Sequence, residues 1–381
     1  MTVALLALVP FLFRLFGLPF DRILYLVCAV LLGWGLAQLA RLELAGLPHL
    51  AERQLVWLTG GIAAMAAGSR LGRDYLFFSR YRYLLLCASL FFLGLTIPFG
   101  YESGGARAWL RLWGIYLQPS ELVRPFLLFF LAGYLGQHAP LFRVHARGLP
   151  PLWRRKWLWG PLLFMWLLSL LILLLQRDLG TAVLYFVAFL VLLYLTSGQI
   201  WHLLGGILLG TTGVLVTAAF APHVRMRFSV WLDPLAAPEG AGFQTARSLF
   251  ALGAGGLLGV GPGRGLPQMT PAVHTDLIFT VIGEELGLAG GLAVLLLYFL
   301  FLVRALALAA RSRDRVGYLF GAGLAFVLGV QALLIIGGSA GAFPLTGITL
   351  PLMSYGGSSL VSTLFGVGIL YGLGAPAEEV G

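Results

Sequence analysis

The sequence predicts an all-α, polytopic membrane protein with about ten transmembrane helices and one long extracytoplasmic segment between helices 7 and 8. Of the 381 residues, 59% are hydrophobic and only 10% are charged, whereas about a quarter of the residues in soluble proteins are charged. Long apolar runs recur along nearly the whole chain. The 51 glycines suit close helix–helix packing in lipid. No soluble domain fits in the lengths that remain.

The positive charges are spread over short loops and do not form one basic face. The formal net charge is +10, and arginine supplies nearly all of it, because Lys156 is the only lysine. Nucleic-acid binding is therefore not predicted. Cys28 and Cys87 both lie in apolar runs, which predicts small core residues and no disulfide framework.

In chain order, the sequence divides into an N-terminal apolar segment (1–22), a transmembrane domain (23–375) and a short cytoplasmic tail (376–381). Residues 1–18 are interrupted by Pro10 and Arg14 and lack a small-residue cleavage site, which predicts an interfacial or partly inserted segment and not a signal peptide. Ten longer apolar runs predict the spans, at approximately 23–40, 55–72, 83–99, 119–136, 157–175, 180–197, 202–221, 277–303, 317–338 and 350–374.

Arginines in alternate loops predict the orientation of these spans. The loops that contain them carry Arg70, Arg73, Arg80 and Arg82, then Arg143, Arg147, Arg154, Arg155 and Lys156, then Arg304, Arg311, Arg313 and Arg315. The positive-inside rule places these loops in the cytoplasm. Both ends of the ten-span core then face the cytoplasm, and the segment 222–276 lies outside.

The segment 222–276 is too apolar to be a disordered linker. Residues Phe243–Leu252 look helical and amphipathic, and the glycine-rich part after them predicts tight turns. We expect the segment to fold back over the outer face of the bundle. Its motif GVGPGRG (259–265) is not a dinucleotide fingerprint, because it neither follows a parallel strand nor opens a βαβ unit.

The stretch Pro271–Gly287, PAVHTDLIFTVIGEELG, carries acidic residues into an apolar run that continues to Val303. One helix through this region would have about 29 residues and a length of roughly 43 Å, which exceeds a bilayer core of about 30 Å. The helix is therefore either strongly tilted, or its first part lies at the surface or in a protein-lined cavity. Glu284 and Glu285 then lie deep, where ionisable groups are costly and point to function; pairing with an arginine is the structural alternative.

Further charged residues gather on the predicted outer side, each with a structural alternative. Glu121 and Arg124, spaced i and i+3, place both charges on one helix face, where a structural ion pair would also explain them. Asp178 could simply stabilise a helix N-terminus. The remaining outer-side residues of this group are Arg107, Trp109, Arg111, Gln176, Arg177, Arg225, Arg227, Arg247 and Arg264.

Asp276 closes the arginine-rich outer segment, and this position suggests chemistry. Converging arginines suit bidentate binding of phosphate groups, and a neighbouring carboxylate suits work as a general base or a metal ligand. The alternative is that Thr275 or Asp276 caps a helix. His274 alone is weak evidence for a metal. The motif SYGGSS at 354–359, with Ser354, Gly356 and Gly357, permits close backbone approach at the start of the last span, and helix packing would also explain it.

Six pieces of the sequence, in the same order, resemble the SEDS proteins, the group of RodA, FtsW and SpoVE. They are GGARAWLRL (104–112), QPSELVR (118–124), QRDLGTAV (176–183), WLDP with FQTARSLFALGAGGLLGVG (231–261), VHTDLIFTVIGEELGLAG (273–290) and PLTGITLPLMSYGGSSL (344–360). The resemblance covers about residues 20–375. Two departures are visible: Arg124 stands where the family usually has lysine, and QRDLGT replaces the commoner QPDLGT but keeps Asp178.

The resemblance implies ten transmembrane helices and a peptidoglycan glycosyltransferase that polymerises lipid II in the bacterial plasma membrane, during elongation or division. The acceptor's GlcNAc 4-hydroxyl would attack the donor's MurNAc anomeric carbon with inversion and release undecaprenyl pyrophosphate. Asp276 matches the family's essential outer-face aspartate, either as the base or as a ligand for a divalent cation (Mg or Mn). The family also implies a partner, a class B penicillin-binding protein that acts as transpeptidase, within the elongation or division machinery.

The predicted site therefore has Asp276 as its catalytic residue. Its supporting or substrate-binding residues are Arg107, Trp109, Glu121, Arg124, Asp178, Arg227, Arg247, His274, Ser354, Gly356 and Gly357. Two other functions stay open at this point: a lipid II flippase that uses the polar groups of the bundle, and a non-enzymatic scaffold for a transpeptidase. A flippase needs a charged path to both faces, whereas these groups crowd on the outer side.

Overall fold

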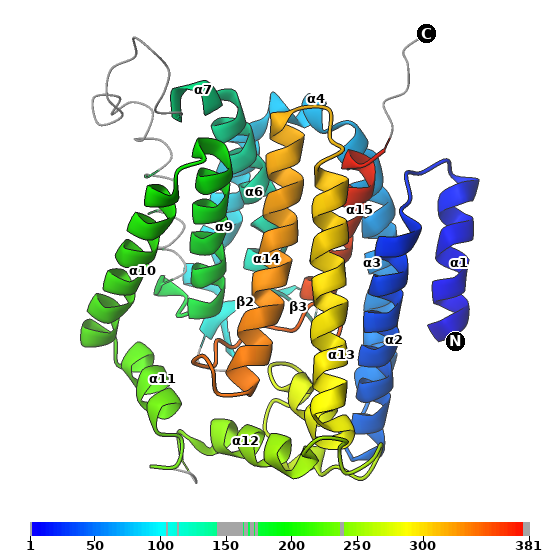
Figure 1. Cartoon of the computed structure of the whole chain (residues 1–381), viewed down its shortest axis with the longest axis vertical. Helices are drawn as coiled ribbons and strands as arrows, with labels where there is room; N and C mark the ends of the chain where they lie inside the picture. The colour runs from blue at the N-terminus through cyan, green and yellow to red at the C-terminus, as the bar shows by residue number, and fades with distance from the viewer. Residues whose placement is uncertain are drawn as a thin grey trace.

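The computed structural model describes residues 2–103, 106–112, 114–142, 163, 167, 171, 174–236 and 240–375 as a helical bundle (Figure 1). The long helices are α2 (Arg22–Leu44), α3 (Leu50–Arg73), α5 (Arg82–Phe99), α6 (Pro119–Gln137), α9 (Leu179–Ser197), α10 (Ile200–Phe220), α13 (Ile278–Ala309), α14 (Arg315–Ser339) and α15 (Gly357–Leu373). Shorter helices are α1 (Thr2–Leu15), α4 (Tyr75–Ser79), α7 (Ala139–Phe142), α11 (Pro222–Leu232), α12 (Phe243–Gly255) and the 3₁₀ turn η2 (Pro267–Met269).

These helices confirm the polytopic all-α class. Each of the nine long helices coincides with one predicted span, and six of the helices are long and apolar enough to cross a membrane by length and composition. The predicted span 157–175 lies almost entirely outside the described residues, as do the basic loop residues 143–156 and the tail 376–381. The number of ten spans therefore stays a prediction.

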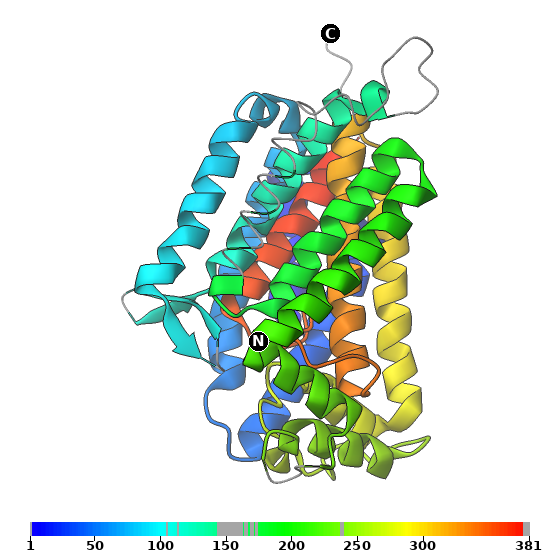
Figure 2. The same ribbon diagram turned by 90° about the vertical axis from the view of Figure 1, so that its left-hand side faces the viewer.

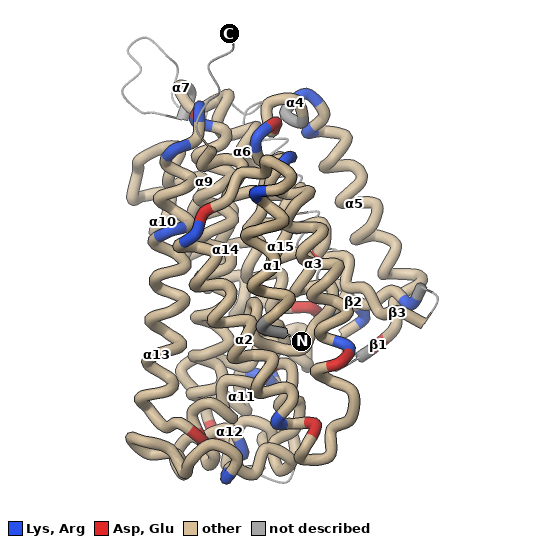
Figure 3. The backbone as a smooth tube through the Cα atoms, turned by 90° about the vertical axis from the view of Figure 1, so that its right-hand side faces the viewer, with Lys and Arg blue, Asp and Glu red and all other residues tan. Residues whose placement is uncertain are grey.

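The two ends of the bundle differ in what they carry. We call the end with α4 and the α13–α14 turn (310–314) the inner end, and the end with α11 and α12 the outer end (Figure 1). The middle parts of α5 and α13 carry no charged residues (Figure 3). Helix α1 lies beside α2, with Val9 and Phe13 buried. Near the inner end, Arg304 donates two hydrogen bonds to Asp21, at 3.0 and 2.5 Å.

Between α5 and α6 the chain forms a small antiparallel sheet. Its strands are β1 (Tyr101–Ser103), β2 (Ala106–Leu112) and β3 (Ile115–Leu117), in the order β1-β2-β3. Tyr101 pairs with Trp109, and Leu110 pairs with Leu117. The sheet lies beyond the outer end of α5, at the edge of the bundle (Figure 2). In β2, Arg107, Trp109 and Arg111 alternate with the apolar residues Ala108, Leu110 and Leu112, which is the period of a strand with two unlike faces.

Helix α13 is broken near its start. The apolar region is therefore not one continuous helix longer than a bilayer core. Gly287 has non-helical angles (φ 65°, ψ −163°). The glycine-rich turn after α12 binds the broken backbone: Val260 N donates to Glu284 O, Gly261 N to Glu285 O, and Leu288 N to Gly256 O, at 2.9–3.0 Å. Residues 278–285 are buried. The first part of the helix therefore lies in a protein-lined environment, as one of the two alternatives predicted, and the outer segment folds back onto the bundle as expected.

The two deep glutamates have structural partners. Glu285 pairs with Arg41 (Oε1–Nε 3.3 Å), and Glu284 Oε1 accepts a hydrogen bond from Leu266 N at 3.1 Å. Arg41 also donates to the carbonyl oxygens of Gly263 and Gly265. Pairing with an arginine, the structural alternative, is therefore correct for Glu285, whereas Glu284 is held by a backbone N–H group. Both glutamates fasten the turn 259–266 to α13.

The most extensive helix contact in the described bundle is between α3 and α15, where glycines let backbone meet backbone. A Cβ on Gly368 would lie 2.0 Å from Met65 O, and one on Gly68 would lie 2.3 Å from Phe365 O. Gly72 and Gly372 are equally tight, with backbone atoms at 2.3 Å. Small residues that permit such approach are typical of helix association in lipid. No substitution larger than glycine fits these positions without moving a helix.

We predict that Gly368→Ala lowers the free energy of unfolding by about 1–3 kcal/mol, because an inserted methyl group meets backbone that cannot rotate away. Gly366→Ala on the same helix is the matched control, since its nearest neighbour is a Leu324 side-chain atom at an ordinary 3.7 Å. The thermal unfolding midpoint of the detergent-solubilised protein measures both. Equal midpoints for the two variants would contradict the backbone contact.

Candidate active site

Asp276 lies in a tight turn just before α13 and does not cap that helix. The helix begins at Ile278, its N-cap position is Leu277, and it has no side-chain cap. Thr275 N and Leu277 N both donate to Ala272 O, at 3.1 and 3.3 Å, and Ala272 has a positive φ of 50°. A non-glycine residue in that region is strained and is often found at functional sites. The turn thus leaves the half-buried Asp276 carboxylate available for other partners.

The loop before α15 holds this turn by its backbone. Tyr355 N donates to His274 O at 2.8 Å, and Ser354 Oγ donates to Thr275 O at 2.5 Å while it accepts from Leu350 N at 2.9 Å. The rings of His274 and Tyr355 lie 5.9 Å apart. Two of the predicted site residues, His274 and Ser354, therefore help to hold the turn that carries Asp276.

Gln54 on α3 fastens that loop in turn. Its Nε2 donates to Ser354 O at 3.1 Å, and its Oε1 accepts from Gly356 N at 3.3 Å. The next residue, Gly357, lies against Trp57, so that a Cβ there would be 2.1 Å from the indole. The glycines of the SYGGSS motif thus permit a close approach to α3, which agrees with the packing interpretation.

Arg227 from α11 reaches the same place as Asp276. Its Nη1 donates to Leu345 O at 2.9 Å. Around the position that a Cβ on Gly347 would occupy, Arg227 Nη2 lies at 3.6 Å and Asp276 Oδ2 at 3.9 Å. Gly347 has a positive φ of 74° and no side chain, so it leaves room for both groups. The geometry brings one carboxylate and one guanidinium together over an open piece of backbone.

Burial and neighbouring charges shift the pKa of two outer-end groups. The pKa of Asp276 is raised to about 6, mainly by burial and also by the Asp178 charge, while a hydrogen bond from Thr275 and the Arg227 charge act in the opposite direction. Burial, together with Arg177 and Arg227, lowers the pKa of His223. At neutral pH the surroundings thus contain an ionised but basic carboxylate and fixed positive charge from arginine.

Asp178 is the N-cap of α9, as its structural alternative predicted. Its Oδ1 accepts from Thr181 N at 3.1 Å, and its Oδ2 accepts from Thr181 Oγ1 at 2.8 Å. Gln118, next to α6, adds a hydrogen bond to Oδ2 at 3.2 Å. The residue therefore ties the start of α9 to the start of α6.

Glu121 and Arg124 form a buried ion pair on α6, with Oε2 and Nη2 2.6 Å apart and both side chains at most 4% exposed. Arg124 also donates to Gln331 Oε1 at 2.6 Å, and Gln331 Nε2 donates to Thr349 O at 2.8 Å. A charge so deep needs an ion-pair partner and further hydrogen bonds. Through Gln331, the pair is joined to the segment 345–349 that Arg227 also contacts.

The structure does not bring every predicted residue to Asp276. Arg107 is exposed on β2, 3.5 Å from Glu102, and only its backbone reaches inward, donating to Gln176 O at 2.9 Å. Trp109 lies on the same strand, paired with Tyr101. Arg247 on α12 lies over the Phe243 ring at 5.3 Å. These three residues belong to the outer surface and have no described contact with Asp276.

Several polar residues of this region were not predicted, above all Gln54, Gln331, Thr349 and His223. One signal was available for Gln331, because a lone amide in the apolar run 316–336 needs a buried partner. Gln54 precedes its apolar run and looks like an ordinary helix-start residue. His223 stands in a segment where sequence alone gives no packing direction.

The arrangement fits a divalent cation only in a limited way. Among the described residues there is no group of three or more His, Cys, Asp or Glu that could hold a metal. Asp276 alone suffices for an ion that takes most of its ligands from substrate phosphates and water, as Mg²⁺ commonly does.

Comparison with known proteins gives a consistent family. Residues 21–378 match the family described as cell cycle protein, FtsW/RodA/SpoVE. The peptidoglycan glycosyltransferase RodA of Mycobacterium tuberculosis is 38% identical over 362 residues, covering 92% of this chain and 77% of that protein. Stage V sporulation protein E of Bacillus subtilis is 33% identical over 324 residues, covering 84% and 85%.

Two solved structures share the fold. A chain from work on the structural coordination of polymerization and crosslinking by a peptidoglycan synthase complex superimposes with a TM-score of 0.75 at 32% identity, covering 93% of this chain and 97% of that one. The rod shape determining protein RodA of Thermus thermophilus gives a TM-score of 0.67 at 30% identity, covering 93% and 96%.

We predict that Ser354→Ala loosens the Asp276 turn without unfolding the bundle, because it removes the hydroxyl that bridges Thr275 O and Leu350 N. Hydrogen–deuterium exchange should become about fivefold faster in peptides covering 271–279 and 350–356, since a hydrogen bond contributes about 1 kcal/mol. Ser229→Ala is the control, because that exposed hydroxyl donates only to Met226 O. Unchanged exchange in both peptides would contradict the holding role of the loop.

Proposed function

The chain belongs to the FtsW/RodA/SpoVE family of peptidoglycan glycosyltransferases, and from this premise we propose that it polymerises lipid II with Asp276 as the catalytic base. One observation supports this proposal above the others: the Asp276 carboxylate and the Arg227 guanidinium lie together over Gly347, each held from a different element. The protein is a polytopic membrane glycosyltransferase of cell-wall synthesis; its residue roles, substrate and partner are our proposals.

In the proposed reaction, the acceptor's GlcNAc 4-hydroxyl lies against Asp276. The carboxylate takes the hydroxyl proton while the oxygen forms a bond to the anomeric carbon of the donor MurNAc. The bond from that carbon to the pyrophosphate breaks with inversion, and undecaprenyl pyrophosphate leaves with the electron pair. A carboxylate with a pKa of about 6 is ionised at neutral pH and is more basic than an ordinary aspartate.

Charge stabilisation falls to the cations around Gly347. Arg227 is already oriented by its bond to Leu345 O, so its guanidinium needs no reorganisation to meet negative charge on the pyrophosphate. Arg177 adds positive charge near His223 and Arg227. Because pyrophosphate is already a good leaving group, positioning and fixed charge carry much of the barrier reduction.

A divalent cation, Mg²⁺ or Mn²⁺, would be held by Asp276 and the substrate phosphates. When bound it would neutralise charge on the pyrophosphate. The protein's own residues still orient the acceptor, through the turn 271–277, and exclude water by the packing of α12 and α13.

We propose that a class B penicillin-binding protein is the partner, because a relative of this fold belongs to a complex described as coordinating polymerization and crosslinking. The described part of the chain contains helices and one small sheet, with no transpeptidase fold. We also propose that the protein resides in the bacterial plasma membrane, as its relatives imply. The arginine-rich loops support an orientation with the inner end in the cytoplasm.

We predict that Asp276→Asn lowers lipid II polymerisation about a hundredfold or more, since a positioned general base contributes about 10²–10⁴. The measurement uses purified protein with its cognate transpeptidase, with Mg²⁺, with Mn²⁺ and with a chelator. Asp233→Asn is the matched control, because that exposed outer-end carboxylate only accepts from Leu235 N and Ala236 N.

Polymer formation by Asp276→Asn at the wild-type rate would remove Asp276 from the mechanism. If wild type makes no polymer in an intact complex but moves lipid II across vesicles, the flippase alternative holds instead. Loss of both activities, with transpeptidase stimulation retained, would indicate the scaffold.

We predict that kcat/KM rises with pH through an apparent pKa near 6, because only ionised Asp276 can take the acceptor proton. Arg227→Gln should move this pKa upward, since Arg227 holds it down, so activity is lost more at pH 6.5 than at pH 8.5. Arg225→Gln, on the same helix but exposed, should leave the profile in place. An identical fractional loss at both pH values for Arg227→Gln would show that Arg227 acts on binding alone.

A further inference from the structure

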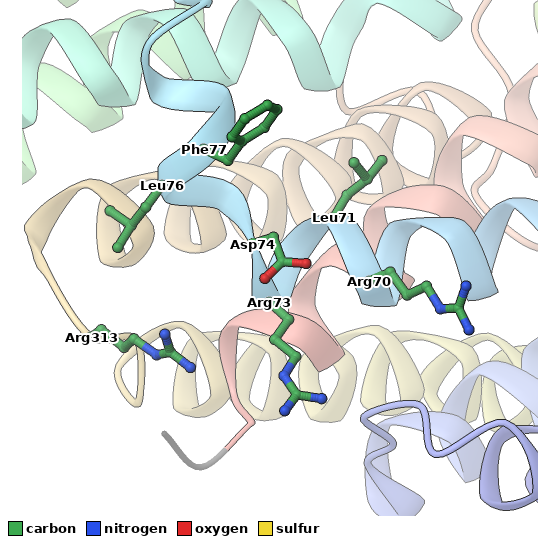
Figure 4. Close-up of a pocket in the computed structure, with 7 residues that line it drawn as sticks. All are labelled: Arg70, Leu71, Arg73, Asp74, Leu76, Phe77 and Arg313. Carbon is green, nitrogen blue, oxygen red and sulfur yellow. The ribbon is translucent and has the colours of Figure 1, made fainter. Parts of the chain in front are cut away.

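The inner end contains an open pocket of about 510 Å³ that the polymerisation reaction does not use (Figure 4). Arg70, Leu71 and Arg73 contribute from the last turn of α3. Asp74, Leu76 and Phe77 follow at the corner and in α4, and Arg313 comes from the α13–α14 turn on the other side. Residues some 240 positions apart in the sequence thus line one cavity.

The pocket is built on a fixed corner of backbone. Asp74 N donates to Arg70 O at 3.2 Å and Phe77 N donates to Asp74 O at 2.9 Å, so α3 turns directly into α4. Tyr75 OH donates to Asp314 Oδ1 at 2.6 Å, and the same oxygen caps α14 by accepting from Gly317 N at 2.8 Å. This bridge holds the α13–α14 turn, and with it the backbone of Arg313, beside the corner.

The charge and the apolar surface of the pocket describe its ligand. Arg70 and Arg313 line the pocket with a single described carboxylate, that of Asp74, and guanidinium groups suit phosphate oxygens. Leu76 and Phe77 are 45% and 58% exposed beside them. A ligand that satisfies both parts has an anionic phosphate and an adjoining apolar part.

Leu71 also lines a second, apolar cavity of about 90 Å³. The other residues lining this cavity are apolar and aromatic and include Tyr75, Phe126, Phe129 and Phe365. A cationic pocket with an apolar cavity on a shared residue suits a ligand that joins a charged headgroup to an acyl chain.

From this geometry we propose that the inner-end pocket binds the phosphate of an anionic phospholipid from the membrane leaflet at that end. The positive-inside rule explains why arginines occur at this end, but it does not require two distant segments to meet around one pocket beside exposed Leu76 and Phe77. Asp74 lines the same pocket, and its carboxylate would accept hydrogen bonds from headgroup hydroxyls, which favours a glycerol-bearing headgroup over a bare phosphate.

The test is native mass spectrometry of the full-length protein in neutral detergent, titrated with dioleoylphosphatidylglycerol and with dioleoylphosphatidylcholine. Arg70→Ala/Arg313→Ala should weaken phosphatidylglycerol binding about fivefold for each arginine removed. Arg80→Ala/Arg311→Ala is the matched control, because it removes the same charge from exposed arginines at the same end that do not line the pocket. It should leave the affinity within about twofold, as for ordinary surface substitutions.

Two further measurements keep the result unambiguous. Arg70→Lys/Arg313→Lys keeps the charge but loses the planar fork, so its affinity should fall between wild type and the alanine variant. Thermal unfolding of every variant checks that the fold is intact.

Equal weakening by both alanine pairs would overturn the pocket, because net charge alone would then explain binding. If inorganic phosphate displaces phosphatidylglycerol at equal concentration, the site recognises a free anion and the lipid proposal fails. The proposal also fails if an acidic peptide, and not the lipid, binds in a manner that depends on Arg70 and Arg313.

Discussion

The close contact between α3 and α15 is the constraint on which the active site depends. Because glycines at 68, 72, 368 and 372 bring backbone against backbone, the two helices cannot slide or rotate without a clash. Gln54 on α3 is thereby held in reach of Ser354 O and Gly356 N. The loop that Gln54 holds then bonds to His274 O and Thr275 O. The position of the Asp276 carboxylate thus depends on helix packing toward the opposite, inner end of the bundle.

Helix α15 also supports the buried ion pair of Glu121 and Arg124. Ser362 Oγ on α15 donates to Glu121 O at 2.6 Å, and Thr349, in the segment before α15, donates to Ser359 Oγ at 2.7 Å. Glu121 and Arg124 cannot be solvated at that depth, so each lost partner would leave an uncompensated charge. Gln331 completes the set, because its amide satisfies Arg124 on one side and Thr349 O on the other. The buried ion pair and the outer-end segment 345–349 are therefore joined by one network of hydrogen bonds.

Hydropathy predicted the helices well, because lipid selects long apolar segments directly. Asp276 could be found from its place after an arginine-rich segment, and Glu285 was correctly given an arginine partner as its alternative. The break at Gly287 was not predicted, since it depends on hydrogen bonds from a turn some thirty residues earlier. Arg107 and Arg247 were grouped with Asp276 because all three lie on the outer side of the bundle. A shared side does not determine where each side chain points: Arg107 on β2 contacts Glu102, and Arg247 on α12 lies over Phe243. Gln54 and Gln331 act through partners hundreds of residues or several helices away, which no local pattern encodes.

The broken start of α13 explains why the glycine-rich turn after α12 is packed against the bundle. Backbone groups freed at Gly287 would be costly in an apolar environment unless other groups bind them, and Gly256, Leu257, Val260 and Gly261 do so. The turn 256–261 and α13 therefore form one unit, fixed further by Arg41 and Glu285. Asp276 lies just before this unit and is held on its other side by Ser354 and Tyr355. A carboxylate fixed from both directions needs little reorganisation when charge develops beside it, so in the proposed mechanism the rigid outer segment keeps Asp276 in place for the acceptor hydroxyl.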